Sequence, residues 1–247
     1  MDLLRRERLV VVLALIAVTL VAWAYLFAAR DDMAMQSMDD MPGMAVPFVA
    51  VWVFAMWWVM MLGMMLPSAA PMLLTFATLQ RRKRERGEAY VPTAMFAAGY
   101  LAVWGGFSVA ATAVQWELQE FALLTPMGVP LSPILGGTLF LLAGVYQFTP
   151  WKNACLHQCR SPFAFVLNHW RDGWSGALHM GVSHGLYCLG CCWVLMTLLF
   201  AVGVMNLLWV AALAALVFAE KLFPHGAWGG RLAGTAMAGF GVWLLVT

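Results

Sequence analysis

Seven stretches of this 247-residue sequence are apolar over a length that can cross a lipid bilayer. They cover roughly residues 9–29, 48–79, 92–115, 132–150, 175–202, 206–222 and 229–246. A crossing helix needs about 20 mostly apolar residues, because each residue advances the helix by only about 1.5 Å. Only 11% of the residues are charged, against about 25% in soluble domains. We therefore expect an all-α, polytopic transmembrane helix bundle of about seven spans, with six or eight crossings as weaker alternatives.

The basic residues favour one orientation of these spans, because cytoplasmic loops carry an excess of Lys and Arg. They occur before the first span, after the second, between the fourth and fifth, and between the sixth and seventh. They are Arg5, Arg6, Arg8, Arg81, Arg82, Lys83, Arg84, Arg86, Lys152, Arg160, Arg171, Lys221 and Arg231. Only Arg30 falls on the opposite side. The pattern predicts a cytoplasmic N-terminus and a periplasmic C-terminus.

Three parts follow from this reading: an N-terminal membrane anchor helix (1–29), a Met-rich periplasmic linker (30–47) and a six-helix metal-binding membrane body (48–247). The apolar part of the first segment, about 21 residues, exceeds the ~7–15 of a signal peptide, so we expect a retained anchor. The sequence contains no phosphate-binding glycine loop, no Ser/His/Asp signature and no nucleic-acid-binding patch. We therefore expect neither an enzyme nor a nucleic-acid partner.

One histidine and three cysteines lie together in the fifth apolar segment. On a helix, Cys188, Cys191 and Cys192 fall about 40°, 340° and 80° round from His184, so all four point to one side. Thiolates and imidazoles suit thiophilic ions, and the stripe therefore predicts a site for Cu(I) first and Zn(II) second. Simple core packing of small cysteines and redox thiol chemistry are the alternatives.

One helix cannot surround an ion, so a second helix must contribute ligands. The second span is the best donor, because eleven of the 18 methionines lie between Met33 and Met72. In antiparallel spans its central methionines reach the same depth as the cysteines. The candidate ligands are Met60, Met61, Met64 and Met65. Core filling is the alternative role of these flexible side chains.

Proline and glycine add expectations about packing. Pro67 and Pro71 remove backbone donors from the second span, so that helix should bend, and the freed carbonyls need partners from neighbouring helices, Ser68 or water. Glycines in the third and seventh spans are expected to be helix-packing positions. They are Gly99, Gly105, Gly106, Gly234, Gly239 and Gly241.

Sulfur also gathers outside the spans. The linker contains Met33, Met35, Met38, Met41 and Met44 among acidic residues, and thioethers remain Cu(I) ligands in an oxidising compartment. An unordered loop without a metal role is the alternative. On the expected cytoplasmic side, Cys155, His157 and Cys159 suit a thiophilic ion or its transfer to a soluble carrier. Glu220 and Lys221, adjacent near the inner end of the sixth span, are expected to form an interfacial ion pair, with a cation- or proton-binding role of Glu220 as the alternative.

Four strings resemble a bacterial family of predicted metal-binding integral-membrane proteins, sometimes labelled copper chaperones. They are MLGMMLPSAAP (61–71), GVYQFTP (144–150), CLHQCRSP (155–162) and HGLYCLGCCW (184–193). Met205-Asn206 and Glu220-Lys221 fit the same pattern, and the resemblance covers nearly the whole chain. It implies metal binding at the positions that match the family: Cys155, Cys159, His184, Cys188, Cys191 and Cys192.

Together these features predict a multi-pass protein of the bacterial inner membrane that binds Cu(I) in a Cys/His/Met site for transport or delivery. The expected partners are the lipid bilayer, the metal ion and a membrane metalloenzyme or soluble metal carrier, and an oligomer is compatible with the sequence. The main alternative is an accessory subunit or assembly factor of a membrane-bound metalloenzyme. A haem or quinone redox protein that uses His184 is a weaker one.

Overall fold

The computed structural model describes residues 2–35, 46–125, 131–223 and 226–247, and the regular elements within these ranges are all α-helices. The helices are α1 (Asp2–Met35), α2 (Val46–Glu85), α3 (Thr93–Glu120), α4 (Pro133–Tyr146), α5 (Pro150–Arg160), α6 (Pro162–Asn168), α7 (Gly173–Thr197), α8 (Leu199–Val202), α9 (Leu207–Leu222) and α10 (Gly226–Val246). The predicted all-α fold class is confirmed. Of the methionine-rich segment, Met38, Met41 and Met44 lie outside the described residues, whereas α1 extends to Met35.

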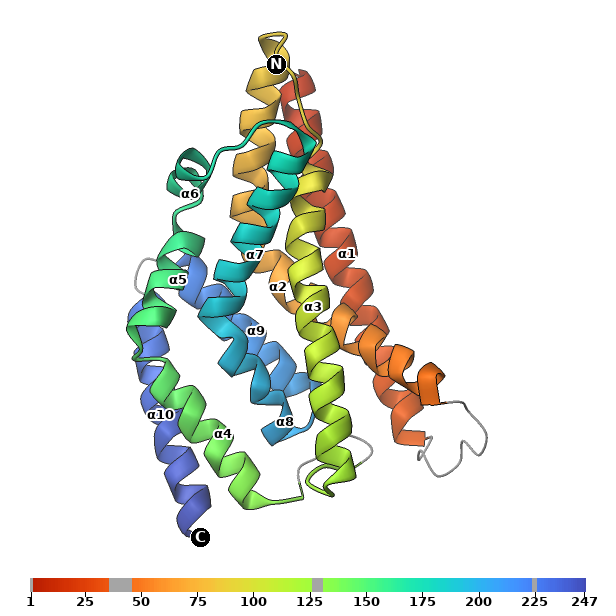
Figure 1. Ribbon diagram of the computed structural model, residues 1–247, viewed down its shortest axis with the longest axis vertical. Helices are drawn as coiled ribbons and strands as arrows, with labels where there is room; N and C mark the ends of the chain where they lie inside the picture. The colour runs from red at the N-terminus through yellow and green to blue at the C-terminus, as the bar shows by residue number, and fades with distance from the viewer. Residues whose placement is uncertain (1, 36–45, 126–130, 224–225) are drawn as a thin grey trace.

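The helices form an elongated bundle in which the most extensive contacts join helices that are far apart in the sequence, α4 with α10 and α3 with α7 (Figure 1). α1 packs along α2, which reaches the far end of the bundle and turns back into α3. α3 packs against α7, and α4 packs against α10 on the opposite side of the molecule. α9 lies between these groups and contacts both α2 and α10, while α5 packs on α7. The site discussed below therefore lies where α2, α5, α7 and α9 meet.

Five helical segments are long and apolar enough to cross a membrane. They are Leu9–Ala29, Val49–Glu85, Thr93–Glu120, Gly173–Val202 and Trp228–Val246. The other two segments expected to cross become α4, with 14 residues, and α9, with 16. Both are shorter than the roughly 20 residues of a typical crossing helix. The structure thus supports a membrane protein, while the count of seven spans and their orientation stay predictions.

Two of the basic residues counted as loop charges are buried inside the bundle. Lys152 is 2% exposed in α5 and Lys221 is 6% exposed in α9, so neither contributes to a charged loop. At the far end of the bundle, Lys83 contacts the Asp172 carboxylate, which links the end of α2 to the start of α7. Hydrogen bonds from Lys83 and Trp170 hold the pKa of Asp172 below its usual range.

Pro67 leaves one backbone carbonyl of α2 without its usual donor, because proline has no N–H to offer the residue four positions earlier. That residue is Gly63, and the indole Nε1 of Trp23 in α1 donates to its carbonyl oxygen at 3.3 Å. The expectation that a neighbouring helix would satisfy a freed carbonyl is confirmed here. α2 also changes direction along its length (Figure 1), as expected for a helix with two internal prolines.

Glycines allow α3 and α7 to touch through their backbones. A Cβ atom at Gly181 would lie 2.0 Å from the Phe96 carbonyl oxygen, and one at Gly99 would lie 2.2 Å from that of Leu178. The predicted packing role is therefore confirmed for Gly99. It is confirmed as well for Gly241, where a Cβ would lie 2.6 Å from the Leu141 backbone nitrogen of α4, and for Gly234, where it would lie 2.6 Å from the Gln147 side chain. The prediction is wrong for Gly106 and Gly239, beside which the described part of the chain places no atom within 4 Å. A Cβ at Gly105 would make only an ordinary contact with Trp58.

We expect Gly181→Ala to destabilise the protein by about 1–3 kcal/mol, the usual cost of overpacking a close contact. Gly106→Ala is the matched control, because it adds the same methyl group to an exposed helical position and should be neutral or slightly stabilising. Unfolding of the purified protein in detergent measures both variants. Equal stability of the two would contradict the backbone contact.

Candidate metal centre

The predicted stripe of α7 is buried in the middle of the bundle. His184 is 2% exposed, Cys188 and Cys191 are each 1% exposed, and Cys192 is fully buried. α7 has no proline, and its glycines allow α3 to pack closely on one side. The helix therefore carries these side chains into the interior of the protein, away from the lipid-facing surface.

The thiols of Cys191 and Cys192 fold back onto their own helix. Each Sγ donates to the carbonyl oxygen of Cys188 at 3.0 Å. These are local bonds from positions three and four residues further along the helix, and a thiol is a weak donor. A rotation about the Cα–Cβ bond of either cysteine is therefore enough to turn its thiol away from this carbonyl.

Methionine sulfur from α2 lies beside this group. Met65 Sδ is 4.0 Å from Cys192 Sγ. The hydroxyl of Tyr100 donates to the Met65 carbonyl at 3.3 Å and lies 3.2 Å from Cys188 Sγ, so α3 also contacts both sulfur residues. The other predicted methionine ligands of α2 are buried in the same core, and they are Met60, Met61 and Met64.

The three predicted metal ligands of α5, which are Cys155, His157 and Cys159, do not lie together in the structure. α5 begins where the Thr149 side chain accepts a hydrogen bond from the backbone N–H of Lys152, and this helix places Cys159 against α7. Cys159 is buried, and its thiol lies within hydrogen-bonding reach of Cys188 and Cys191 of α7. Cys159 therefore joins the buried sulfur residues of α7 and does not stand apart from them.

Cys155 and His157 lie outside that group. Cys155 is half-buried and packs on Gly190 of α7, where an added Cβ would lie 2.7 Å from its sulfur. His157 is exposed. We call Cys159, Cys188, Cys191, Cys192 and Met65 the sulfur cluster from here on.

His184 lies one helical turn before Cys188 and packs against aromatic side chains. Its ring stacks on Tyr100 with centroids 5.6 Å apart and meets Phe165 edge-on at 5.4 Å. Its Nδ1 atom is buried and has no hydrogen-bond partner among the residues that the structure describes. In the tautomer that carries its proton on Nε2, Nδ1 is free to accept a proton or a metal ion.

The predicted ion pair between Glu220 and Lys221 is wrong. Lys221 Nζ donates instead to Cys188 Sγ at 2.9 Å and to Ser68 Oγ at 3.1 Å, whereas Glu220 pairs with Lys152 at 2.7 Å. Adjacent residues on a helix point about 100° apart, so they face different neighbours. Sequence reasoning missed Lys221 as part of the site, and only its unusual place inside an apolar segment could have drawn attention to it.

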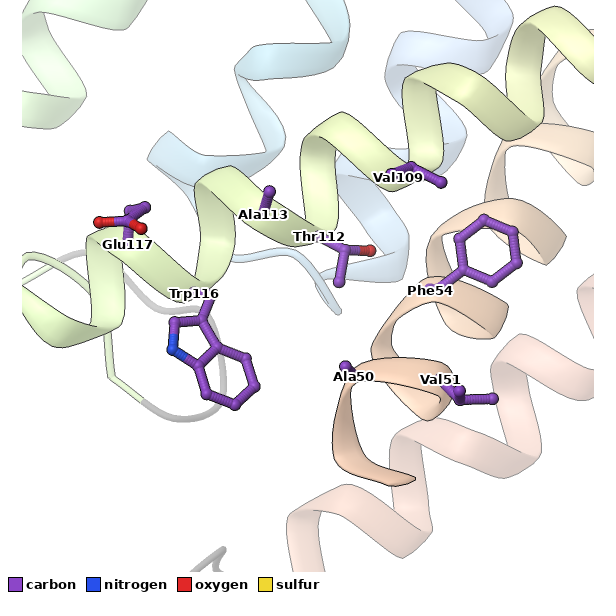
Figure 2. Close-up of a pocket in the computed structure, with 8 residues that line it drawn as sticks. All are labelled: Ala50, Val51, Phe54, Val109, Thr112, Ala113, Trp116 and Glu117. Atoms are coloured by element: carbon purple, nitrogen blue, oxygen red, sulfur yellow. The ribbon is translucent and has the colours of Figure 1, made fainter. Parts of the chain in front are cut away.

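The residues of the sulfur cluster lie close together, but their side chains do not converge on one point as the ligands of a bound metal ion do. Within the described ranges, no group of three or more His, Cys, Asp or Glu side chains stands in a geometry that could hold a metal ion. A groove of about 460 Å³ between α2 and α3 is unrelated to the cluster. It is lined mainly by apolar side chains such as Phe54, Val109 and Trp116, with no cysteine, histidine or methionine (Figure 2).

Fold and site together define an integral-membrane helix bundle with a buried cluster of soft sulfur ligands. The chain belongs to the copper chaperone family PpoB2, whose family model matches residues 54–244. The matched region contains the sulfur cluster, Lys221 and the Lys152–Glu220 pair. Searches among curated proteins and among solved structures found no match.

We expect the buried Lys152–Glu220 pair to show strong coupling. Glu220→Gln leaves the Lys152 charge buried without its partner and should cost about 3–5 kcal/mol of stability. Lys152→Met should cost a similar amount, and the double variant should lose much less than the sum of the two. Detergent unfolding titrations measure the cycle.

Glu85→Gln provides the matched control, because Glu85 is exposed and its contact with Arg81 at 3.5 Å is a surface ion pair. Such pairs contribute at most about 1 kcal/mol. Additive losses at Lys152 and Glu220 would show that the two residues do not stabilise each other.

Proposed function

We propose that this membrane protein binds Cu(I) at the sulfur cluster and delivers it to an acceptor or moves it through the membrane. The observation that carries the proposal is the meeting of four buried cysteines and one methionine, from α2, α5 and α7, at one place in the bundle. Thiolates and thioethers together select Cu(I) over harder ions. Membership of a copper chaperone family supports both the metal and the delivery role.

Loading requires only a small rearrangement. The thiol of Cys192 would leave the Cys188 carbonyl, release its proton to solvent and bind the ion as a thiolate, losing a hydrogen bond worth about 0.5–1.5 kcal/mol. For comparison, zinc-finger peptides bind their structural Zn(II) through thiolates with roughly 10–16 kcal/mol. Metal binding therefore outweighs the cost of opening the resting arrangement by a wide margin.

The remaining soft ligands define a proposed route on either side of the cluster. Methionines of the segment 33–44 would collect the ion at the outer surface, and those of α2 would pass it to the cluster. Cys159 and Cys155 would release it toward the exposed His157 and a soluble carrier or membrane metalloenzyme. His184 is a proposed further ligand, through its unpartnered Nδ1. The route runs through Met60, Met61, Met64, Met65, Cys192, Cys188, Cys191, Cys159 and Cys155.

We place the protein in the bacterial inner membrane, as a binding and transfer protein rather than an enzyme. The concentration of Arg and Lys at residues 81–86, next to the α2–α3 turn, supports a cytoplasmic position for that end of the bundle. The same ligands serve movement of copper in either direction.

Protein purified without oxygen and loaded with Cu(I) should retain about one copper per chain. Replacing Cys188, Cys191 and Cys192 together by serine should remove most of it, since hydroxyls are poor Cu(I) ligands. Cys155→Ser is the comparison variant: it should keep the copper of the sulfur cluster, because Cys155 packs on Gly190 and would receive the ion only after its release from the cluster. Elemental analysis measures the content, and unchanged copper in the triple variant would refute the proposal.

Met65→Leu should weaken Cu(I) binding about tenfold, a loss of about 1.4 kcal/mol. The substitution preserves volume, so stability should change little. Met180→Leu is the matched control and should leave Cu(I) affinity unchanged. Met180 is equally buried in α7, but its Sδ is not part of the sulfur cluster and accepts a hydrogen bond from the Arg171 backbone at 3.4 Å. Competition with a chromogenic Cu(I) chelator measures both. Equal affinities would exclude Met65 as a ligand.

A further inference from the structure

Lys221 is a buried positive charge without a carboxylate partner among the described residues. Its ammonium group is held by Cys188 Sγ at 2.9 Å and Ser68 Oγ at 3.1 Å. The neighbouring carboxylate of Glu220 is already engaged by Lys152 at 2.7 Å, with both side chains 2% exposed. The Lys152–Glu220 pair is neutral as a unit, so the charge of Lys221 faces the sulfur cluster alone.

An uncompensated charge inside an apolar bundle is costly, and it persists only where an opposite charge can meet it. The groups able to supply that charge beside Lys221 are the cysteines, because a thiol that binds a metal does so as a thiolate and releases its proton to solvent. The total charge of the loaded site therefore depends on the metal, on the number of thiolates and on Lys221.

We propose that Lys221 is a specificity-determining residue that matches the charge of the sulfur cluster to a monovalent metal ion. The inference rests on the proposed function and names Cys188, Cys192 and Met65 as the ligands of the bound ion. Cys188 contacts Lys221, and Cys192 lies 4.0 Å from the Met65 sulfur. Two thiolates and one thioether form a three-coordinate set that suits Cu(I).

The charges then select between metals. With two thiolates, a monovalent ion leaves the ligand set at −1, and Lys221 brings the site to zero. A divalent ion such as Zn(II) gives a neutral ligand set, and Lys221 leaves the site at +1 in surroundings that solvate charge poorly. Lys221 thus favours Cu(I) over Zn(II) independently of the softness of the ligands.

The test compares the affinities of the full-length protein for Cu(I) and for Zn(II), each measured by competition with a chromogenic chelator in detergent without oxygen. Lys221→Met removes the charge and preserves most of the side-chain volume. We expect the ratio of Cu(I) to Zn(II) affinity to fall about tenfold or more. Lys221→Arg keeps the charge and should keep the ratio within about threefold of the unaltered protein.

Ser68→Ala is the matched control for the hydrogen bond, because it removes one acceptor of Lys221 and leaves the charge in place; its ratio should also stay within about threefold. If Lys221→Met does not fold, Lys221→Gln supplies a neutral side chain that can still donate to Ser68. An unchanged ratio in the folded neutral variant overturns the role of Lys221. Absence of Cu(I) binding by the unaltered protein refutes the proposed function instead, so the two failures are distinct.

Discussion

The burial of two lysines inside an apolar bundle is the constraint around which the centre of this protein is organised. A buried ammonium group needs partners, and each lysine finds them on another helix. Lys152 of α5 meets Glu220, and Lys221 meets Cys188 and Ser68. Because Glu220 and Lys221 are adjacent on α9, these contacts set the register of that helix against α2, α5 and α7 at once. The sulfur cluster lies where they converge.

The backbone contact of α3 with α7 completes the surroundings of the cluster. Gly99 and Gly181 let the two helices approach to a distance that excludes any Cβ atom. That approach brings the Tyr100 hydroxyl to both Met65 and Cys188 and packs the same ring on His184. Small residues remote from the sulfur atoms thus determine which polar groups reach them, as is common where membrane helices pack closely.

The resting geometry is consistent with a protein that must release what it binds. Two of the cluster thiols donate to the carbonyl of their own helix, so these two donors are satisfied without a metal ion. Because each bond is weak, the proposed release of Cu(I) would return these thiols to the carbonyl one at a time. Family membership identifies the chain as a copper chaperone relative, and such stepwise exchange is what transfer between proteins requires.

The sequence alone determined the helical class, the shared face of the α7 cysteines and the need for a partner to the Gly63 carbonyl, four residues before Pro67. These follow from hydropathy, helical period and the missing proline N–H. It could not determine that α4 and α9 are too short to match the longer spans, or that Cys159 joins the membrane cysteines while His157 stays exposed. It also paired Glu220 with Lys221, whereas the fold gives each a different partner. The sequence shows which charged groups and thiols the chain contains. Which of them meet is decided by the packing of α5 and α9 on α7, because that packing joins residues that are far apart in the sequence.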